Sequence, residues 1–494
     1  MKMRKTKQEI IIPDVEVSDA GAEGKAIVRI DGMVVFVPFV VPGDIIDLKI
    51  IKKKKNYAEG RALAVKQPSP RRIDAQCPHF GTCGGCKWQT FEYVGQLRCK
   101  EQQVRDNLER LGHIDTSGMR PIDGSEKIFH YRNKLEFTFS NKRWLSEGEV
   151  RSENDPGAVG FHVPTVFDKV LPIEQCALQP EPSNQIRNSL RDYALSHNIP
   201  FYDIRNHTGF LRNLVIRNTS TGEWMVIVIV AEKNDGLLMP LLEFLKNKFP
   251  VITSLLYIIN SKMNDSYTDL EVHTYSGQDY ITEQMPRYNG GAPLQFRINP
   301  KSFYQTNSQQ AFRLYSYVAE FAQLRGNENV YDLYTGTGTI AQFLAGMCRH
   351  VTGIEYVEEA IVDARLNARL NGFDNCTFYA GDMAKVLTDD FVAANGRPDV
   401  VVTDPPRAGM HEKVVEQLLA IEAPRIVYVS CNPATQARDL QLLEAKYDIK
   451  RIQPVDMFPH TQHVENVAEL ILKEKKKKKI THIKKNYYLC MLIF

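Results

Sequence analysis

Short apolar stretches alternate with glycine-containing turns at the start of the chain. Five such stretches are rich in β-branched residues and cover residues 10–13, 25–30, 33–38, 45–51 and 61–65. Several short strands at this spacing are typical of a small β-barrel. The polar segment QPSPRR at 67–72 ends the pattern, so we expect the barrel to lie within residues 1–70.

Helical and strand-like periods are mixed in the next part of the chain. Leu97, Val104, Leu108 and Leu111 recur at helical spacing and predict a helix over 96–111. Further helices are expected at 185–196 and 237–248, and strands at 134–139, 214–218, 224–230 and 254–260. These patterns predict a central α+β domain over residues 71–290.

Strand and helix patterns alternate regularly from about residue 295. Strands are expected at 330–333, 351–355, 377–379, 400–403 and 426–430, with helices at 358–371 and 411–419. Alternating β and α units are typical of a mostly parallel, doubly wound sheet. The sequence therefore predicts an α/β fold of the Rossmann-like kind over residues 291–472, followed by a tail at 473–494.

Charge is distributed unevenly over the 494 residues, although the formal net charge is only +3. Residues 1–72 carry +6 and residues 473–485 carry +7, which leaves −10 for residues 73–472. Two basic ends suggest a polyanionic partner such as a nucleic acid. The chain has neither the run of about 20 apolar residues that a membrane span needs nor a secretory signal, so we expect a soluble, cytoplasmic protein.

A glycine-containing loop follows the strand expected at 330–333. Asp332 is followed by Gly336 and Gly338, which allow a tight turn and close approach to a ligand. Glu355 ends the next expected strand, where it can accept hydrogen bonds from two ribose hydroxyls. The pattern is typical of a nucleotide-type cofactor site, although a tight turn in an unrelated α/β protein would also satisfy it.

Two further motifs follow expected strands of the same sheet. The first is DPPR at 404–407, and the second is SCNP at 430–433, which contains Cys431. A methyl transfer to oxygen or nitrogen needs no thiol, whereas carbon C5 of a pyrimidine is a poor nucleophile until a thiolate adds to C6. Cys431 is therefore a candidate nucleophile, although a single buried cysteine is more often an inert core residue.

The removal of the C5 proton requires a base, and the segment FPHTQHVE at 458–465 offers candidates. Its two histidines and Glu465 could also form a metal site, but they lack the helical spacing of paired ligands, and Pro459 interrupts any helix. We favour Glu465 as the general base and assign the histidines positioning or structural roles.

Three cysteines gather before the first expected helix. Cys77, Cys83 and Cys86 are joined by a fourth, Cys176, about ninety residues later. Four thiolates suit either a tetrahedral zinc ion or an iron–sulfur cluster, and the spacing does not choose between them.

Together these motifs resemble those of the RNA uracil-C5 (5-methyluridine) methyltransferase family, especially its ribosomal-RNA type. The resemblance covers nearly all of residues 1–472 and rests on SFYQTN (302–307), DLYTGTGT (332–339), Glu355, DPPR, SCNP and FPHTQHVE. It implies that Gln305, Tyr334, Glu355 and Asp404 contact S-adenosylmethionine, that Cys431 is the nucleophile and that Glu465 is the base. Family members commonly have Phe at the position of Tyr334.

The resemblance also implies two accessory features. The barrel would be a TRAM domain, an OB-like RNA-binding module to which the run Lys52–Lys55 is suited. Cys77, Cys83, Cys86 and Cys176 would bind a [4Fe-4S] cluster with a structural or RNA-orienting role. Segments 129–137 and 209–217 mix aromatic and cationic residues as RNA-binding surfaces do, or as ordinary strands with solvated arginines do.

We therefore expect S-adenosylmethionine-dependent methylation of uridine C5 in RNA, with 23S ribosomal RNA as the substrate and with no membrane or protein partner implied. A transfer RNA substrate for the same chemistry is the alternative. A non-catalytic RNA-binding assembly factor is an alternative from another class. The tail at 473–494 is expected to add only salt-sensitive, non-specific affinity for RNA.

Overall fold

The computed structural model describes residues 9–146, 148–150, 152, 155–164 and 166–474. All but the first two residues of the Lys-rich tail therefore lie outside the described residues. Within those ranges, no helix has both the length and the apolar character required to cross a bilayer.

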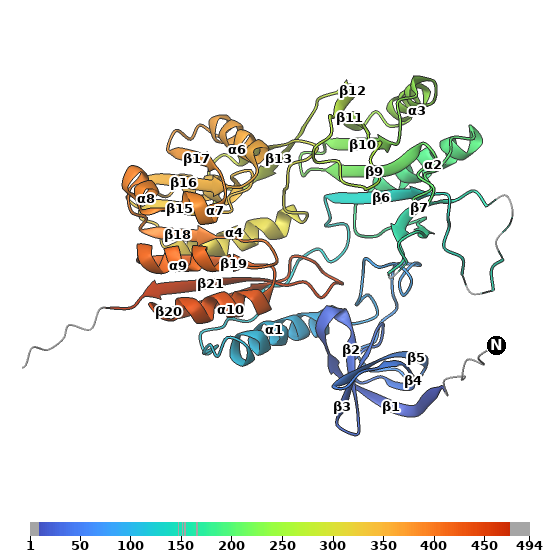
Figure 1. Cartoon of the computed structure of the whole chain (residues 1–494), viewed down its shortest axis with the longest axis horizontal. Helices are drawn as coiled ribbons and strands as arrows, with labels where there is room; N and C mark the ends of the chain where they lie inside the picture. The colour runs from blue at the N-terminus through green and yellow to red at the C-terminus, as the bar shows by residue number, and fades with distance from the viewer. Residues whose placement is uncertain (1–8, 147, 151, 153–154, 165, 475–494) are drawn as a thin grey trace, which may run out of the picture.

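The N-terminal part is a closed five-stranded barrel, as the sequence predicts (Figure 1). Its strands are β1 (Ile10–Ala20), β2 (Ala26–Ile30), β3 (Met33–Val37), β4 (Ile45–Lys53) and β5 (Tyr57–Gln67). The barrel closes because β4 pairs with both β5 and β1. Small β-branched side chains such as Val17, Val28 and Val35 fill its interior. Residues 52–55, at the end of β4 and in the turn that follows it, are exposed.

The central part is a seven-stranded sheet in the order β12-β11-β10-β9-β6-β7-β8. Its strands are β6 (Lys134–Ser140), β7 (Ala158–His162), β8 (Val170–Pro172), β9 (Leu211–Asn218), β10 (Trp224–Val230), β11 (Ile252–Ile259) and β12 (His273–Gly277). Alternate residues of β10 enter different cores. Val226 and Val228 pack with α2 (Ser183–Ser196) and α3 (Asp235–Lys248), whereas Ile227 and Ile229 pack towards the C-terminal part.

Strand β9 bears on the two alternatives that the sequence leaves open for segment 209–217. Arg212 and Arg217 are only 1% and 6% exposed, so they do not form an RNA-binding surface. Arg217 instead donates through Nη2 to the carbonyl oxygen of Ser302 at 2.8 Å. The strand is central in its sheet, and its cations serve internal packing.

The C-terminal part is a seven-stranded, doubly wound sheet, which confirms the predicted fold class. The strand order is β17-β16-β15-β18-β19-β21-β20. Its strands are β15 (Asn329–Leu333), β16 (His350–Glu355), β17 (Cys376–Ala380), β18 (Val400–Thr403), β19 (Arg425–Ser430), β20 (Tyr447–Val455) and β21 (Glu465–Leu472). A separate hairpin of β13 (Ile281–Met285) and β14 (Leu294–Ile298) precedes it.

Helices connect the strands of this sheet and cover both of its faces (Figure 1). They are α4 (Ser308–Ala322), α5 (Thr339–Ala345), α6 (Glu358–Leu370), α7 (Met383–Val386), α8 (Asp389–Asn395), α9 (Glu412–Ile421) and α10 (Pro433–Leu443). The residues at the start of α10 favour a helix terminus there. The Asn432 side chain accepts from the backbone N–H of Ala434, and Pro433 occupies the first turn.

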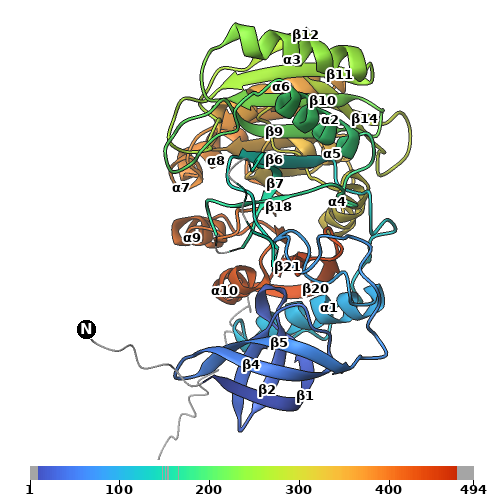
Figure 2. The same cartoon turned by 90° about the vertical axis from the view of Figure 1, so that its right-hand side faces the viewer.

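Two long-range features bring distant parts of the chain to the C-terminal sheet. Helix α1 (Tyr93–Arg110) packs on α10 and β20, between the barrel and the sheet (Figures 1 and 2). The last two strands form an antiparallel hairpin, in which β21 lies between β19 and β20. The N-terminal end of β21 therefore meets the edge at which the parallel strands end.

Candidate active site

Polar residues gather at the C-terminal edge of the parallel strands, where ligands bind in doubly wound sheets. Strand β15 leads into the glycine loop, β16 ends at Glu355, β18 leads into Asp404 and β19 leads into Cys431. Ser430 pairs with Asn466, so continuing the antiparallel register by one residue places Cys431 opposite Glu465. The motifs that the sequence singles out therefore share one edge.

The glycine loop is held by two carboxylates. Asp332 accepts hydrogen bonds from the Thr335 hydroxyl and, at 3.0 Å, from the Ala341 backbone N–H at the start of α5. Glu355 accepts from the backbone N–H groups of Gly336 at 3.1 Å and Val357 at 3.0 Å. Burial raises the pKa of Asp332 to about 7. These contacts shape the loop before any ligand binds.

The backbone at Gly336 leaves room for a ligand. Its φ is +56°, and nothing in the protein lies within 4 Å of the position that a Cβ would take. At Gly338, by contrast, a Cβ would lie 3.0 Å from the Ala364 side chain, so that glycine permits close packing of α6. The two glycines thus have different roles, and only Gly336 borders open space.

A cavity of about 340 Å³ adjoins this loop. Tyr334, itself at φ +63°, lines it together with Asp382, which follows β17, and His411, which caps α9. The open backbone at Gly336, the Glu355 carboxylate and this cavity together fit a nucleoside-type cofactor. Asp382 was missed by the sequence reasoning, although an acidic residue directly after the next parallel strand was a signal for it.

Cys431, Glu465 and Asp404 form the second half of the site, and they act on one another electrostatically. Burial, together with the Asp404 carboxylate, raises the pKa of Glu465 to about 8, and Arg407 opposes this shift. Burial and the carboxylates of Glu465 and Asp404 raise the pKa of Cys431 to about 11. Loss of solvent likewise raises the pKa of Asp404 to about 7.

Arg407 joins the DPPR and SCNP segments. Its carbonyl oxygen accepts hydrogen bonds from the Asn432 side-chain amide at 3.0 Å and the Thr435 hydroxyl at 3.2 Å. Its guanidinium is the cation that acts on both Cys431 and Glu465. The sequence analysis included Arg407 only as part of the DPPR motif and did not anticipate its place beside the candidate nucleophile and base.

A second, larger cavity of about 990 Å³ connects the cysteine-rich segment with the motifs of the C-terminal sheet. Four thiols line it: Cys77, Cys83, Cys86 and Cys176. The residues that line it from the C-terminal motifs are Phe303, Thr306, Arg407, Phe458, Thr461 and His463. The volume suffices for a nucleotide with its flanking groups. Among these residues, Phe303 is 69% exposed.

The four thiols lie close enough to influence one another. Burial is the main cause that raises the pKa of Cys83 to about 11 and of Cys86 to about 12, and the other thiols add to both shifts. The Gly85 backbone N–H lies 3.4 Å from the Cys83 sulfur, and the Gln89 amide lies 3.2 Å from the Cys86 sulfur. No three His, Cys, Asp or Glu side chains in the described ranges are placed as ligands of a single metal ion.

Gln305 lies in a loop that is fixed from both sides. Its carbonyl oxygen accepts from the Asn133 side-chain amide at 2.9 Å, and Asn307 caps α4. The Gln305 side chain is half-buried, while Phe303 and Thr306 of the same loop reach the large cavity.

Proteins similar to this chain are found among RNA methyltransferases. The family model described as tRNA (Uracil-5-)-methyltransferase matches residues 271–475, and the TRAM domain model matches residues 12–63. A protein of Bacteroides thetaiotaomicron named "Uncharacterized RNA methyltransferase" is 56% identical over 458 residues, which are 92% of this chain and 100% of the relative. A Porphyromonas gingivalis protein of the same name is 53% identical, covering 92% and 99% of the two chains.

The chain belongs to the RNA uracil-C5 methyltransferase family.

A solved structure of the same family supports the assignment in three dimensions. It is the Pyrococcus abyssi tRNA (uracil-54, C5)-methyltransferase in complex with S-adenosyl-L-homocysteine, with a TM-score of 0.71 and 28% sequence identity. The match covers 92% of this chain and 99% of that one. The chain is thus an S-adenosylmethionine-dependent RNA uracil-C5 methyltransferase with an N-terminal TRAM domain, as the resemblance implies.

Proposed function

We propose that this methyltransferase modifies C5 of a uridine through a covalent bond between the Cys431 sulfur and C6 of the base. The observation that carries the proposal is the antiparallel pairing of Ser430 with Asn466, because Cys431 and Glu465 are the neighbours of this pair and the Glu465 carboxylate helps to raise the pKa of Cys431. A thiol and a buried carboxylate side by side are the nucleophile and the base that this chemistry needs.

Cys431 starts the reaction by adding to C6. The bond from sulfur to C6 makes C5 electron-rich, so that C5 can accept a methyl group. The thiol acts as the thiolate, and Arg407 and the N-terminal end of α10 are the positive groups that favour this form. Release requires that C5 lose its proton, after which the C6–S bond breaks and the double bond returns.

Glu465 is the proposed acceptor of the C5 proton. It is 5% exposed, and its pKa is raised by burial to about 8, so its carboxylate is a stronger base than that of an ordinary glutamate. The positive charge of Arg407 favours the ionised form that the step requires.

The residues at the edge of the sheet fit S-adenosylmethionine. Glu355 is placed to accept from ribose hydroxyls, Tyr334 lines the adjoining cavity, and we assign Gln305 and Asp404 to the same cofactor. When bound, S-adenosylmethionine supplies the electrophilic methyl group. Gly336 leaves the space that a bound cofactor would occupy.

Cys77, Cys83, Cys86 and Cys176 are the proposed ligands of a [4Fe-4S] cluster. Zinc would need four sulfurs at about 2.3 Å from one ion, whereas each thiolate of a cubane cluster binds a different iron. The four thiols line one cavity, which supports a common bound group, and the family resemblance of the sequence favours the cluster over zinc. The backbone and amide N–H groups near Cys83 and Cys86 suit anionic sulfur. The cluster would shape the RNA-binding cavity, since methyl transfer needs no electron.

We assign 23S ribosomal RNA as the substrate, bound in part by the exposed Lys52–Lys55 run of the barrel. The target uridine must leave its base stack to reach the 990 Å³ cavity, where the exposed Phe303 offers a stacking surface. Transfer RNA is the second candidate, because the P. abyssi structure of similar overall fold is named as a transfer-RNA enzyme. Both RNAs are available to a cytoplasmic enzyme.

The test is methylation with labelled S-adenosylmethionine of separate ribosomal and transfer RNA pools. We expect 5-methyluridine in the ribosomal pool. Label in the transfer RNA pool alone would mean that transfer RNA, and not 23S ribosomal RNA, is the substrate. Cys431→Ala should abolish product, whereas the matched control Cys376→Ala, on β17, should retain it.

Glu465→Gln should accumulate an RNA–protein adduct that survives denaturing gels, because proton removal precedes release of the thiol. Full activity of Cys431→Ala would refute the covalent route. Unaltered turnover of Glu465→Gln would remove that residue from the role of base.

A further inference from the structure

The loop that leads into Glu465 is attached to a distant part of the chain. Residues 456–464 connect β20 to β21, and Val455 pairs with Glu465 across the hairpin. Phe458, Thr461 and His463 of this loop line the large cavity. The loop therefore carries cavity-lining side chains and sets where β21 begins.

Lys100 of α1 reaches this loop from inside the protein. Its Nζ lies 2.6 Å from Oδ1 of Asp456, and both side chains are fully buried. The same Nζ donates to the carbonyl oxygen of Phe458 at 3.0 Å, and Asp456 Oδ1 also accepts from the Phe458 backbone N–H at 3.0 Å. Tyr93 donates to the other Asp456 oxygen at 2.8 Å. Lys100 thus closes a turn at the start of the loop.

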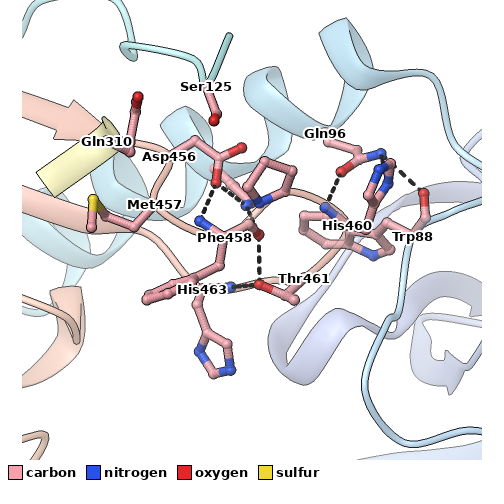
Figure 3. Close-up of polar contacts among 12 residues, drawn as sticks. Trp88, Gln96, Ser125, Gln310, Asp456, Met457, Phe458, His460, Thr461 and His463 are labelled. Atoms are coloured by element: carbon pink, nitrogen blue, oxygen red, sulfur yellow. Dashed lines mark hydrogen bonds and ion pairs between the residues drawn. The ribbon is translucent and has the colours of Figure 1, made fainter. Parts of the chain in front are cut away.

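The contacts continue from this turn towards Glu465. The Thr461 hydroxyl donates to the Phe458 carbonyl oxygen at 2.8 Å and accepts from the His463 backbone N–H at 3.3 Å (Figure 3). His463 is two residues ahead of Glu465. The Phe458 carbonyl oxygen is shared by Lys100 and Thr461, so a change at Lys100 reaches the segment beside the base.

The middle of the loop is held by the segment that follows the cysteines. The His460 carbonyl oxygen accepts from the backbone N–H groups of Lys87 at 2.8 Å and Trp88 at 3.1 Å. Gln96 of α1 accepts from the His460 backbone N–H at 2.9 Å and donates to the Trp88 carbonyl oxygen at 3.0 Å (Figure 3). His460 itself has φ +65°, a strained value for a non-glycine residue that these contacts maintain.

A fully buried ion pair is weak evidence for a stabilising role, because desolvation of two charges offsets their attraction. Burial lowers the pKa of Lys100, and the Asp456 carboxylate opposes this shift. A lysine ammonium offers three donors, and here two of its bonds are made to the one loop that precedes the base. These two bonds hold the 456–464 loop in place.

We propose that Lys100 is a positioning residue for catalysis, which holds Glu465 against the C5 proton through Asp456 and the 456–464 loop. The inference rests on the proposed function, in which Glu465 takes the C5 proton while the C–H electron pair re-forms the C5–C6 double bond and Cys431 leaves as thiolate. A displaced Glu465 would slow this step and leave the earlier bond between Cys431 and C6 intact.

The experiment uses the double variant Lys100→Met/Asp456→Asn in the full chain, since Lys100→Met alone would leave Asp456 buried without its cation. The matched control is the double variant Arg451→Met/Glu469→Gln, which removes an ion pair (2.9 Å) from the same hairpin, away from the loop. We expect kcat of the double variant to fall about 10- to 100-fold, as displacements near 1 Å do. The KM for S-adenosylmethionine should stay unchanged, and the denaturation-resistant RNA adduct should increase. The control should keep its kcat within about threefold and show no adduct.

A folded double variant with the kcat of the wild type would overturn the inference. Loss of kcat without adduct would also overturn it, because a merely structural role lowers the amount of active enzyme and traps no intermediate. Absence of 5-methyluridine with the wild type, or of adduct with Glu465→Gln, would instead contradict the proposed function. The two failures are therefore distinguishable.

Discussion

The buried carboxyl of Glu465 makes the stability of this methyltransferase depend on pH in a way that can be measured. Its pKa is raised from 4.5 to about 8, chiefly by burial. In the folded protein the carboxyl therefore holds its proton more tightly than in the unfolded chain. The contribution to stability is fully present below the unfolded pKa and is lost as the pH rises through the folded pKa. Glu465→Gln removes this dependence while keeping the shape of the side chain.

The size of the effect follows from the linkage between proton binding and folding. Between the two pKa values, one such group lowers the free energy of unfolding by about 1.4 kcal/mol per pH unit. From pH 5 to pH 7.5, the wild type should therefore lose about 3 kcal/mol more than Glu465→Gln. Glu465 is 5% exposed, so solvent does little to screen the effect.

Urea unfolding followed by far-ultraviolet circular dichroism at several pH values measures this difference. A suitable control is Glu416→Gln, which removes the same formal charge from an exposed position on α9. The control should follow the wild-type curve. Parallel curves for wild type and Glu465→Gln would refute the reasoning, because they would mean that Glu465 has the same proton affinity in the folded and unfolded states.

Three further predictions concern the cofactor loop, the cysteines and the tail. Gly336→Ala should weaken S-adenosylmethionine binding at least about tenfold in calorimetry, since its Cβ enters open space beside the loop. The control is Gly372→Ala, at a glycine with φ +71° and similar free space. Both substitutions should lower the free energy of unfolding by ~1 kcal/mol, but the control should leave cofactor binding unchanged. Anaerobically purified protein should be brown with broad visible absorption, and Cys86→Ser should lose this colour while Cys99→Ser keeps it. A colourless protein with one bound zinc would contradict the cluster assignment. Deletion of residues 473–494 should flatten the dependence of RNA affinity on salt, by roughly 0.7 in the logarithmic slope per lysine lost from the contact, and leave the choice of uridine unchanged. An unchanged slope would show that the tail does not contact RNA.

Much of the fold could be predicted because its signals are local. Helix α1 was expected at 96–111 and spans Tyr93–Arg110, since Val104 and Leu108 form one apolar face. The parallel strands were found because each is a short β-branched run followed by a polar motif. The sequence left open whether segment 209–217 is an RNA-binding surface or an ordinary strand, because the residue pattern of β9 does not reveal that its sheet is covered on both faces.

The candidate chemistry could also be found from the sequence, since Cys431 and Asp404 directly follow strands in short motifs and Glu355 ends a strand. Asp382, Arg407 and Phe303 were not singled out as site residues, because their significance depends on the cavities that they line with residues far away in the chain.

The sequence by itself determined the barrel, the class of the catalytic sheet and the chemical groups available for C5 methylation, because these depend on local patterns and on residue type. Only the tertiary structure decided which groups meet. That Glu465 follows β20 after a short loop says nothing about the direction of the next strand, yet β21 runs antiparallel between β19 and β20 and so begins at the edge where Cys431 lies. A parallel strand would have put Glu465 at the opposite edge. The contacts of Lys100 and Gln96 with the preceding loop likewise join residues more than 350 positions apart, and long-range packing alone brings them together.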